Sequence, residues 1–216
     1  MKKHIALLFA AVFALTLVAG CAGGQASSSA AASSEAASSE AAASAEAASG
    51  IVVDTAAKTV TVSAVATGNT GESSIHFLVN ENGKNAPKAH FTTSVTPREL
   101  YDALESIGAE HGDNIALDDK GGTIEGSDIK MTIAFDGKEF IPSELVAGAD
   151  GRTSQPRFGG NIDANEEMGT GCMFCLESCS LGITSDSAYE YTEPMEFTPT
   201  ANMPAAGTEV TFTLAL

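Results

Sequence analysis

Residues 59–66 read Thr-Val-Thr-Val-Ser-Ala-Val-Ala, a stretch in which apolar and small polar side chains largely alternate. Successive side chains of a β-strand point to opposite faces, so Val60, Val62 and Ala64 would share one face. A period of two is typical of a strand in a sheet with one covered face. We therefore expect a half-buried strand here, in an antiparallel or mixed sheet.

Other segments repeat this alternation or contain a short apolar run, and they predict the rest of the sheet. The clearest are 128–135 and 209–216, where every second residue is apolar. The other expected strands are 51–54, 74–80, 88–95 and 138–141. Asn82-Gly83 is a turn signal that would fold 88–95 back onto 74–80 as a hairpin.

One helix is expected over about residues 97–107. Thr96 is a typical N-cap residue, Pro97 suits the first helical position, and Glu99 completes a capping box. The residues at i, i+3, i+4 and i+7 then form one apolar stripe: Leu100, Ala103, Leu104 and Ile107. We predict one α+β domain over 50–216, with a mostly antiparallel or mixed sheet, this one clear helix and a cysteine-containing loop region.

The start of the chain is typical of an exported bacterial lipoprotein. Lys2 and Lys3 precede an uncharged apolar run at 5–18, and small residues lead to Cys21. This pattern resembles a lipoprotein signal peptide, and the run is too short to span a hydrocarbon core of about 30 Å comfortably. We expect residues 1–20 to be removed and Cys21 to be lipidated. The chain would then be anchored to a membrane outside the cytoplasm.

Residues 21–49 predict a flexible tether between the lipid and the domain. After Cys21 the segment contains Ala, Ser, Gly, Glu and one Gln, and it has no aromatic or branched apolar residue with which to build a core. The whole chain has a net charge of −17. That charge argues against nucleic acid as a partner and against binding of anionic lipid by the domain itself. Membrane contact is therefore assigned to the lipid on Cys21, which carries two or three acyl chains in lipoproteins.

The chemistry-bearing stretch is a cluster of three of the four cysteines. Cys172, Cys175 and Cys179 have the spacing C-x2-C-x3-C, which is close to half of a bacterial ferredoxin motif. Neighbouring thiolates are stabilised when a shared cation joins them, so a bound metal would explain the clustering. The three sulfur atoms would then converge on one point. No histidine follows the C-x2-C pair, which excludes the usual covalent haem attachment.

Three interpretations of this cluster stay open. The first is a metal or iron–sulfur site with three thiolates and one further ligand. The start of the chain has no twin arginine, so we expect the Sec route, which exports unfolded chains. Such a chain would acquire Zn2+ or Cu+ outside the cytoplasm more readily than a preassembled cluster. The second is dithiol redox chemistry at Cys172 and Cys175, with Cys179 as a resolving thiol. The third is a structural disulfide with one cysteine left over.

Several segments resemble the YdjY-type domain, a family commonly labelled ferredoxin-like, 4Fe–4S. They are 58–62 (Lys-Thr-Val-Thr-Val), His76-Phe77-Leu78-Val79, Phe158-Gly159-Gly160-Asn161 and the cysteine block, and the resemblance covers about residues 51–187. It implies that Cys172, Cys175 and Cys179 are cluster ligands. Ser180 stands where the family often has proline, and the domain contains no fourth cysteine, so an all-cysteine 4Fe–4S site within one chain is excluded.

Other side chains are candidates to complete a metal site. His76 and His90 would be neighbours on the two arms of the expected hairpin. Met173 lies between the cysteines, and a thioether suits Cu+. Each of these three residues also has an ordinary structural interpretation, as a hydrogen-bonded histidine or a packing methionine.

The sequence contains no Gly-x-Ser-x-Gly, P-loop or His-Glu-x-x-His motif that would predict an enzyme. We expect an accessory redox or metal-binding module that serves a membrane-associated protein partner, with no catalytic residue of its own. The alternative is an interaction domain whose cysteines are structural or thiol-redox groups.

Overall fold

The computed structural model describes residues 50–69, 71 and 74–216. The expected signal peptide at 1–20, the lipidation of Cys21 and the tether at 21–49 lie outside the described residues. No helix in the described ranges is long and apolar enough to cross a membrane.

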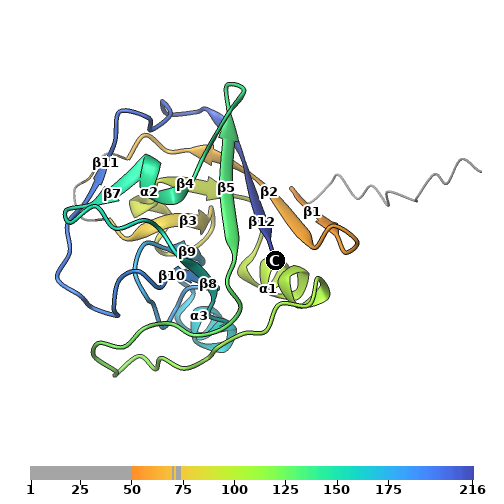
Figure 1. The fold of residues 1–216 in the computed structure, drawn as a ribbon, viewed down its shortest axis with the longest axis vertical. Coiled ribbons are helices and arrows are strands. Elements are labelled where there is room, and N and C mark those ends of the chain that lie inside the picture. Colours follow the sequence, from red (N-terminus) through yellow and green to blue (C-terminus); the bar gives the residue numbers. More distant parts are fainter. Residues whose placement is uncertain (1–49, 70, 72–73) are drawn as a thin grey trace, which may run out of the picture. The chain divides into compact units, whose positions relative to one another are not determined.

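Twelve strands occur in the described part of the chain, and most of them form one curled sheet (Figure 1). Their bounds are β1 (Ile51–Asp54), β2 (Thr59–Ala66), β3 (His76–Asn80), β4 (Phe91–Thr93), β5 (Lys130–Phe135), β6 (Lys138–Phe140), β7 (Val146–Gly148), β8 (Pro156–Phe158), β9 (Cys172–Cys175), β10 (Thr184–Asp186), β11 (Phe197–Pro199) and β12 (Glu209–Ala215). The large sheet has the order β6-β5-β12-β2-β4-β3-β9-β10-β8, with β1 paired to β2, while β7 and β11 form a separate ribbon.

The long strands follow the alternation in the sequence. Strand β2 pairs antiparallel with β12 along its length, and Val62 lies opposite Phe212. Val60, Val62 and Ala64 are buried, whereas Ser63 and Val65 face outward. Strand β12 pairs on its other edge with β5. The half-buried strands predicted from the period of two are therefore present at this side of the sheet.

The predicted helix is present as α1 (Pro97–Ser106). Thr96 accepts a hydrogen bond from the backbone N–H of Glu99, and the Glu99 carboxylate accepts one from the backbone N–H of Thr96. This reciprocal capping box fixes where the helix begins. The buried face of α1 packs on β1, β2 and β9.

The predicted α+β class is wrong, because the domain is mostly β. Besides α1, the described residues contain only two short α-helices, α2 (Pro142–Leu145) and α3 (Ile162–Met168), and one 3-10 turn, η1 (Ala86–Lys88). Sequence alternation did not predict strands β7 to β11, which are three or four residues long. Every residue of β9 and β10 is buried, so neither strand shows an alternation of apolar and polar side chains.

The predicted hairpin between 74–80 and 88–95 is also wrong. Strands β3 and β4 pair in parallel, with Leu78 opposite Phe91. The chain turns at Asn82-Gly83, passes through η1, and returns to run beside β3 in the same direction. Strand β4 then pairs antiparallel with the end of β2. The predicted turn at Asn82-Gly83 is present, but η1 lengthens the connection to β4. The other edge of β3 pairs with β9.

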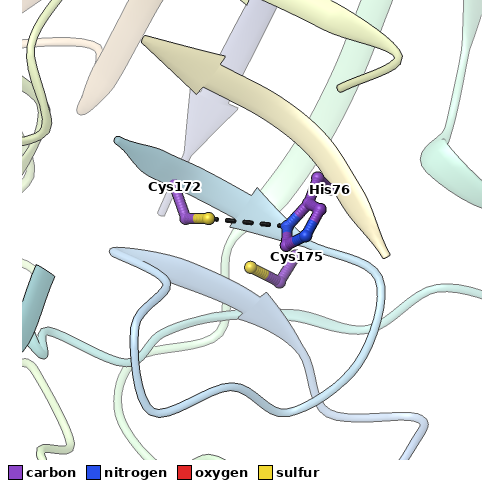
Figure 2. A group of neighbouring side chains, drawn as sticks. All are labelled: His76, Cys172 and Cys175. Atoms are coloured by element: carbon purple, nitrogen blue, oxygen red, sulfur yellow. Dashed lines mark hydrogen bonds between the residues drawn. The ribbon is translucent and has the colours of Figure 1, made fainter. Parts of the chain in front are cut away.

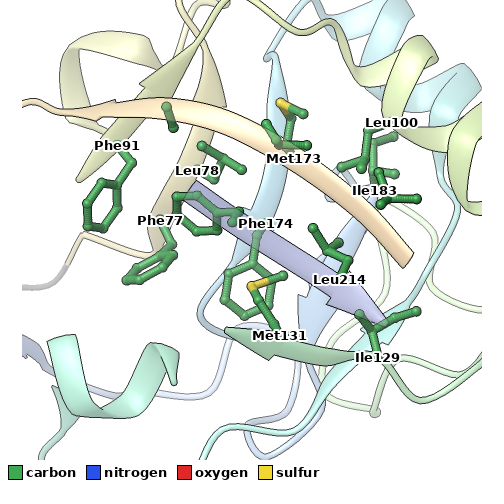
Figure 3. Close-up of a cluster of buried hydrophobic side chains, with 14 of the residues drawn as sticks. Phe77, Leu78, Phe91, Leu100, Ile129, Met131, Met173, Phe174, Ile183 and Leu214 are labelled. Atoms are coloured by element: carbon green, nitrogen blue, oxygen red, sulfur yellow. The ribbon is translucent and has the colours of Figure 1, made fainter. Parts of the chain in front are cut away.

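A cluster of aromatic rings forms the centre of the core (Figure 3). Phe77 of β3 is fully buried, and its ring centroid lies 5.0 Å from that of Phe91 and 5.6 Å from that of Phe174. Phe212 of β12 contacts the same ring at 5.9 Å. All three pairs are edge-to-face, which is a favourable geometry for aromatic rings. Phe77 of β3 therefore packs against rings from β4, β9 and β12.

Strands β9 and β10 are parallel neighbours joined by only residues 176–183, which we call the crossover loop. Parallel strands usually need a connection of about a dozen residues or more. Here Thr184 lies opposite Phe174, so the loop must run back along β9 to reach the start of β10. The third cysteine of the block, Cys179, lies in this loop.

We predict that Phe77→Ala lowers the free energy of unfolding by about 3–5 kcal/mol, because it removes a fully buried ring from three aromatic contacts. Leu117→Ala is the control, since Leu117 is largely exposed and should change stability by less than about 0.5 kcal/mol. Urea denaturation followed by circular dichroism measures both. A loss below about 1 kcal/mol for Phe77→Ala would contradict this packing.

Candidate metal centre

Strands β3 and β9 bring two cysteines and one histidine together. The strands are antiparallel, with His76 opposite Cys175 and Val79 opposite Cys172. Figure 2 shows the three side chains directed toward one another, His76 from β3 and the two cysteines from β9. Residues separated by about a hundred positions in the chain thus form one group.

An irregular register explains why both cysteines point the same way. In a regular strand, residues three apart project from opposite faces. The β3–β9 pairing shifts register on both sides of Leu78, and such irregularities re-aim side chains. As a result, Cys172 and Cys175 line a small cluster with Val79 and Ala89, while the intervening Met173 and Phe174 pack into the main core.

The donor atoms of the group are close enough to share one ion. The two sulfur atoms and a ring nitrogen of His76 lie within 4.8 Å of one another. Cys172 Sγ is 3.6 Å from His76 Nδ1. Ligands of one tetrahedral zinc ion lie roughly 3.4–3.8 Å apart, because the bonds are about 2.0–2.3 Å long. Small side-chain rotations would therefore bring His76, Cys172 and Cys175 into coordination.

The cysteines are more buried than His76, and the two thiols differ in pKa. Both cysteines are buried and free, and His76 is half-buried, so the group is reached from the side of the histidine. The hydrogen bond from the Cys175 thiol lowers the pKa of Cys172, with smaller contributions from His76 and Asn85 that act against burial. The same contact raises the pKa of Cys175 well above its ordinary value. The thiolate form is therefore favoured at Cys172 over Cys175, and a negatively charged sulfur there would attract a cation.

Asn85 completes the surroundings of Cys172, and sequence reasoning missed it. Its side-chain Nδ2 donates a hydrogen bond to Cys172 Sγ over 3.3 Å. Asn85 is the N-cap of η1, and its backbone N–H donates to the carbonyl oxygen of Thr170. The only available sequence signal was its place just after the Asn82-Gly83 turn, which gives no hint of a contact with β9.

Cys179 lies beside the group but outside it. The group whose donor atoms lie within 4.8 Å of one another contains His76, Cys172 and Cys175 and not Cys179, although the Cys179 thiol hydrogen-bonds with the Cys175 thiol. The backbone N–H of Leu181 donates to Cys179 Sγ over 3.4 Å. The three sulfur atoms therefore do not converge on one point as the sequence predicted; His76 replaces the third sulfur.

The other candidate ligands have structural roles. Met173 is fully buried in the main core. His90 is buried, and its two ring nitrogens face the carbonyl oxygens of Asn69 and Ser74 at 3.1 and 3.2 Å. Burial lowers the pKa of His90 despite these two contacts. Neither residue belongs to the donor group.

The segment 158–161 holds the crossover loop in place. Asn161 adopts a left-handed backbone conformation with φ of 49°, and its Nδ2 donates to the carbonyl oxygens of Cys179 and Gly182. Asp113 accepts a hydrogen bond from the backbone N–H of Asn161. The segment therefore contributes to the site by fixing the loop that carries Cys179, and it binds no donor atom of the group.

A buried carboxyl group, Glu177, lies in the crossover loop near the histidine. Burial raises its pKa to about 7, opposed by a hydrogen bond from the Thr192 backbone and by the charge of His76. It adds a second ionisable group beside the imidazole that sequence reasoning did not identify.

The arrangement distinguishes the interpretations of the cysteine block. Cys172 and Cys175 are three residues apart along β9, and a strand that rises about 3.3 Å per residue separates their Cα atoms by roughly 10 Å. A disulfide needs Cα atoms about 4.4–6.8 Å apart. This Cα spacing disfavours a direct Cys172–Cys175 bond, whereas their free sulfur atoms lie within 4.8 Å and could share an ion.

The fold and the site define a class: a mostly β domain in which a strand pair presents a buried thiol–imidazole group that could hold a metal ion. Residues 51–215 match the model of the YdjY domain, and the chain belongs to this family.

A curated relative is an uncharacterized protein, YdjY, of Escherichia coli strain K12. It is 36% identical over 119 residues, which are 54% of this chain and 53% of the relative, so the chain spans about half the length of that protein. No solved structure matches the chain.

We predict that metal-free protein retains one thiolate well below the ordinary thiol pKa, because Cys172 accepts hydrogen bonds from Cys175 and Asn85. Ultraviolet absorbance of the thiolate, recorded as the pH is lowered from about 10, measures this. Asn85→Ala should move the Cys172 midpoint to higher pH, and Cys172→Ser should remove the low-pH signal.

The matched control is Cys179→Ser, which should keep the low-pH thiolate signal. A titration in which all thiolate absorbance disappears near the ordinary thiol pKa of about 8.5 would contradict the assignment.

Proposed function

We propose that the protein is a lipid-anchored accessory protein that binds a single thiophilic metal ion, Zn2+ or Cu+, through His76, Cys172 and Cys175. The observation that carries the proposal is the convergence of one imidazole and two free, buried thiols within 4.8 Å.

The chemistry of the donors supports this choice of metal. Thiolate ligands favour Cu+ and Zn2+, and imidazole suits both ions. A divalent zinc ion would be neutralised by two thiolates, and the proton held by the Cys172–Cys175 pair would leave when it binds. Two cysteines and one histidine leave one tetrahedral position open, as in zinc sites that exchange a ligand. Asn85 would orient the Cys172 sulfur from outside the coordination sphere.

The same donors fit an iron–sulfur cluster poorly. Such clusters are usually held by four cysteine thiolates, each on its own side of the cluster. Here only two of the three described cysteines face the group, and the donors crowd within the space of one ion. The donor group therefore does not fit the 4Fe–4S cluster that the family resemblance implies.

The accessory role rests on the position of the site and on the start of the chain. His76 is half-buried while both sulfur atoms are buried, so an ion would enter or leave past the imidazole. A signal peptide followed by Cys21 would place the domain at a membrane surface outside the cytoplasm. A membrane-associated protein that gives or receives the ion is the partner that fits this location.

Metal binding is tested on the full chain, purified in detergent under reducing conditions and titrated with Zn2+ and with Cu+ against a chromophoric chelator. We expect one ion per chain. Cys172→Ser and Cys175→Ser should each weaken binding by more than about 100-fold, because loss of a ligand costs more than loss of an outer-shell contact. His76→Ala should weaken it by at least about 10-fold.

Cys179→Ser is the matched control, since it removes a thiol of the same cluster that lies outside the donor group. Affinity close to that of the wild type supports the proposed ligand set. Weak binding in Cys179→Ser together with full binding in His76→Ala would contradict it, as would the lack of stoichiometric binding by the reduced wild type.

The anchoring is tested by a change at one residue. We predict that Cys21→Ser abolishes lipid attachment, so that the chain either keeps its uncleaved N-terminus or appears in the soluble fraction. Fractionation with immunoblotting and mass measurement of the mature N-terminus detect this. Equal membrane recovery of the variant and the wild type, with no lipid mass on Cys21 of the wild type, would contradict the lipoprotein assignment.

A further inference from the structure

Cys175 has two sulfur neighbours. Its thiol hydrogen-bonds with Cys172, which belongs to the donor group, and with Cys179, which does not. Cys175 and Cys179 also pack in the same small apolar cluster as Val79 and Ala89. Cys179 thus has no part in the proposed ion binding, yet it touches one of the ligands.

The crossover loop makes this second contact. It leaves β9 at Cys175 and turns back on itself, because Thr184 must reach the position opposite Phe174. At its far end the loop passes Cys175 again: a Cβ on Gly182 would lie 3.3 Å from Cys175 Sγ. The loop therefore returns to the Cys175 sulfur, and Cys179 packs in the same buried cluster as Cys175.

From this geometry we propose that Cys175 exchanges between two states. In one it is a metal ligand together with His76 and Cys172. In the other it forms a disulfide with Cys179 and is no longer available as a ligand. The inference rests on the proposed function for its first state. The disulfide itself depends only on the loop geometry.

The chain conformation selects Cys179 over Cys172 as the disulfide partner. Cys172 is separated from Cys175 by an extended strand, which holds their Cα atoms roughly 10 Å apart. Cys179 is joined to Cys175 by a reversing loop without regular secondary structure, which can adjust more easily than a central strand. Cys179 is also the most exposed of the three, at 6% compared with 1% for Cys172 and none for Cys175.

The step needs an oxidant, and a low-molecular-weight disulfide is the class we assign. The Cys179 thiolate attacks one sulfur of that disulfide, forms a mixed disulfide and releases one small thiolate. Cys175 gives its proton to the small thiolate released first, and its sulfur then attacks Cys179 Sγ and releases the second small thiolate. Two protein thiols are oxidised, and one small disulfide is reduced to two thiols.

The consequence for the metal follows from the number of ligands left. The disulfide removes Cys175 from the donor group and leaves His76 with a single thiolate. Two ligands hold Zn2+ or Cu+ far more weakly than three, so oxidation would release the ion and reduction would restore the site. Metal binding would then depend on the thiol–disulfide balance at the membrane surface.

The first test uses the metal-free full chain in glutathione redox buffers of increasing oxidised fraction, quenched with acid and alkylated, with disulfides mapped by peptide mass spectrometry. We expect a Cys175–Cys179 disulfide in the wild type and equally in Cys172→Ser. Cys179→Ser should form no internal disulfide. A major Cys172–Cys175 disulfide, or no internal disulfide in the wild type under oxidising conditions, would overturn the proposal.

The second test measures zinc affinity of the same samples. Oxidised wild type should bind as weakly as the Cys175→Ser variant and recover after reduction, while Cys179→Ser should keep its affinity in oxidised buffer. Loss of affinity in oxidised Cys179→Ser equal to that of the wild type would also overturn the switch. Failure of the reduced wild type to bind metal, with the Cys175–Cys179 disulfide still formed, would instead refute the proposed function alone.

Discussion

Strand β9 lies between β3 and β10, antiparallel to the first and parallel to the second, and its side chains serve two different clusters at once. Met173 and Phe174 must fill the main core, where Phe174 meets the ring of Phe77. Packing of Met173 and Phe174 in the core fixes how deeply β9 is buried and which way its side chains point. Cys172 and Cys175 are thereby directed into the smaller cluster beside His76. The donor group is a consequence of core packing on the opposite side of the same strand.

This arrangement couples stability to chemistry. A buried thiol pair that shares one proton is costly unless hydrogen bonds or a cation compensate the negative charge. Asn85 and His76 supply part of that compensation, and both are held by the backbone, through η1 and through β3. An ion in the group would supply the rest. The crossover loop stays close to Cys175 because Asn161 binds two of its carbonyl oxygens.

The sequence predicts the parts of the fold that have one face in solvent. The strands at 59–66 and 209–216 and the capped helix at 97–107 are present, since alternation and capping residues are local signals. The class was misjudged because β9 and β10 are buried on both faces and too short to show any period. The parallel pairing of β3 and β4 was missed because a turn signal does not give the length of the connection that follows.

The candidate site was only partly predictable for a similar reason. Spacing of the cysteines in the chain drew attention to the right segment, but which sulfur atoms face each other depends on the irregular register of β9 against β3. His76 was a candidate on hairpin geometry that does not occur, and it reaches the group through a different strand pairing. Asn85 and Glu177 had no sequence signal, since their contacts arise only when η1 and the crossover loop fold over the strand pair.

X-ray absorption spectroscopy at the zinc edge of the zinc-loaded, reduced full chain tests the central claim most directly. Coordination by His76, Cys172 and Cys175 predicts a first shell with two sulfur atoms at about 2.3 Å and an imidazole nitrogen at about 2.0–2.1 Å. A shell with three sulfur atoms, or one without sulfur, would contradict the assignment of His76, Cys172 and Cys175 as the ligand set.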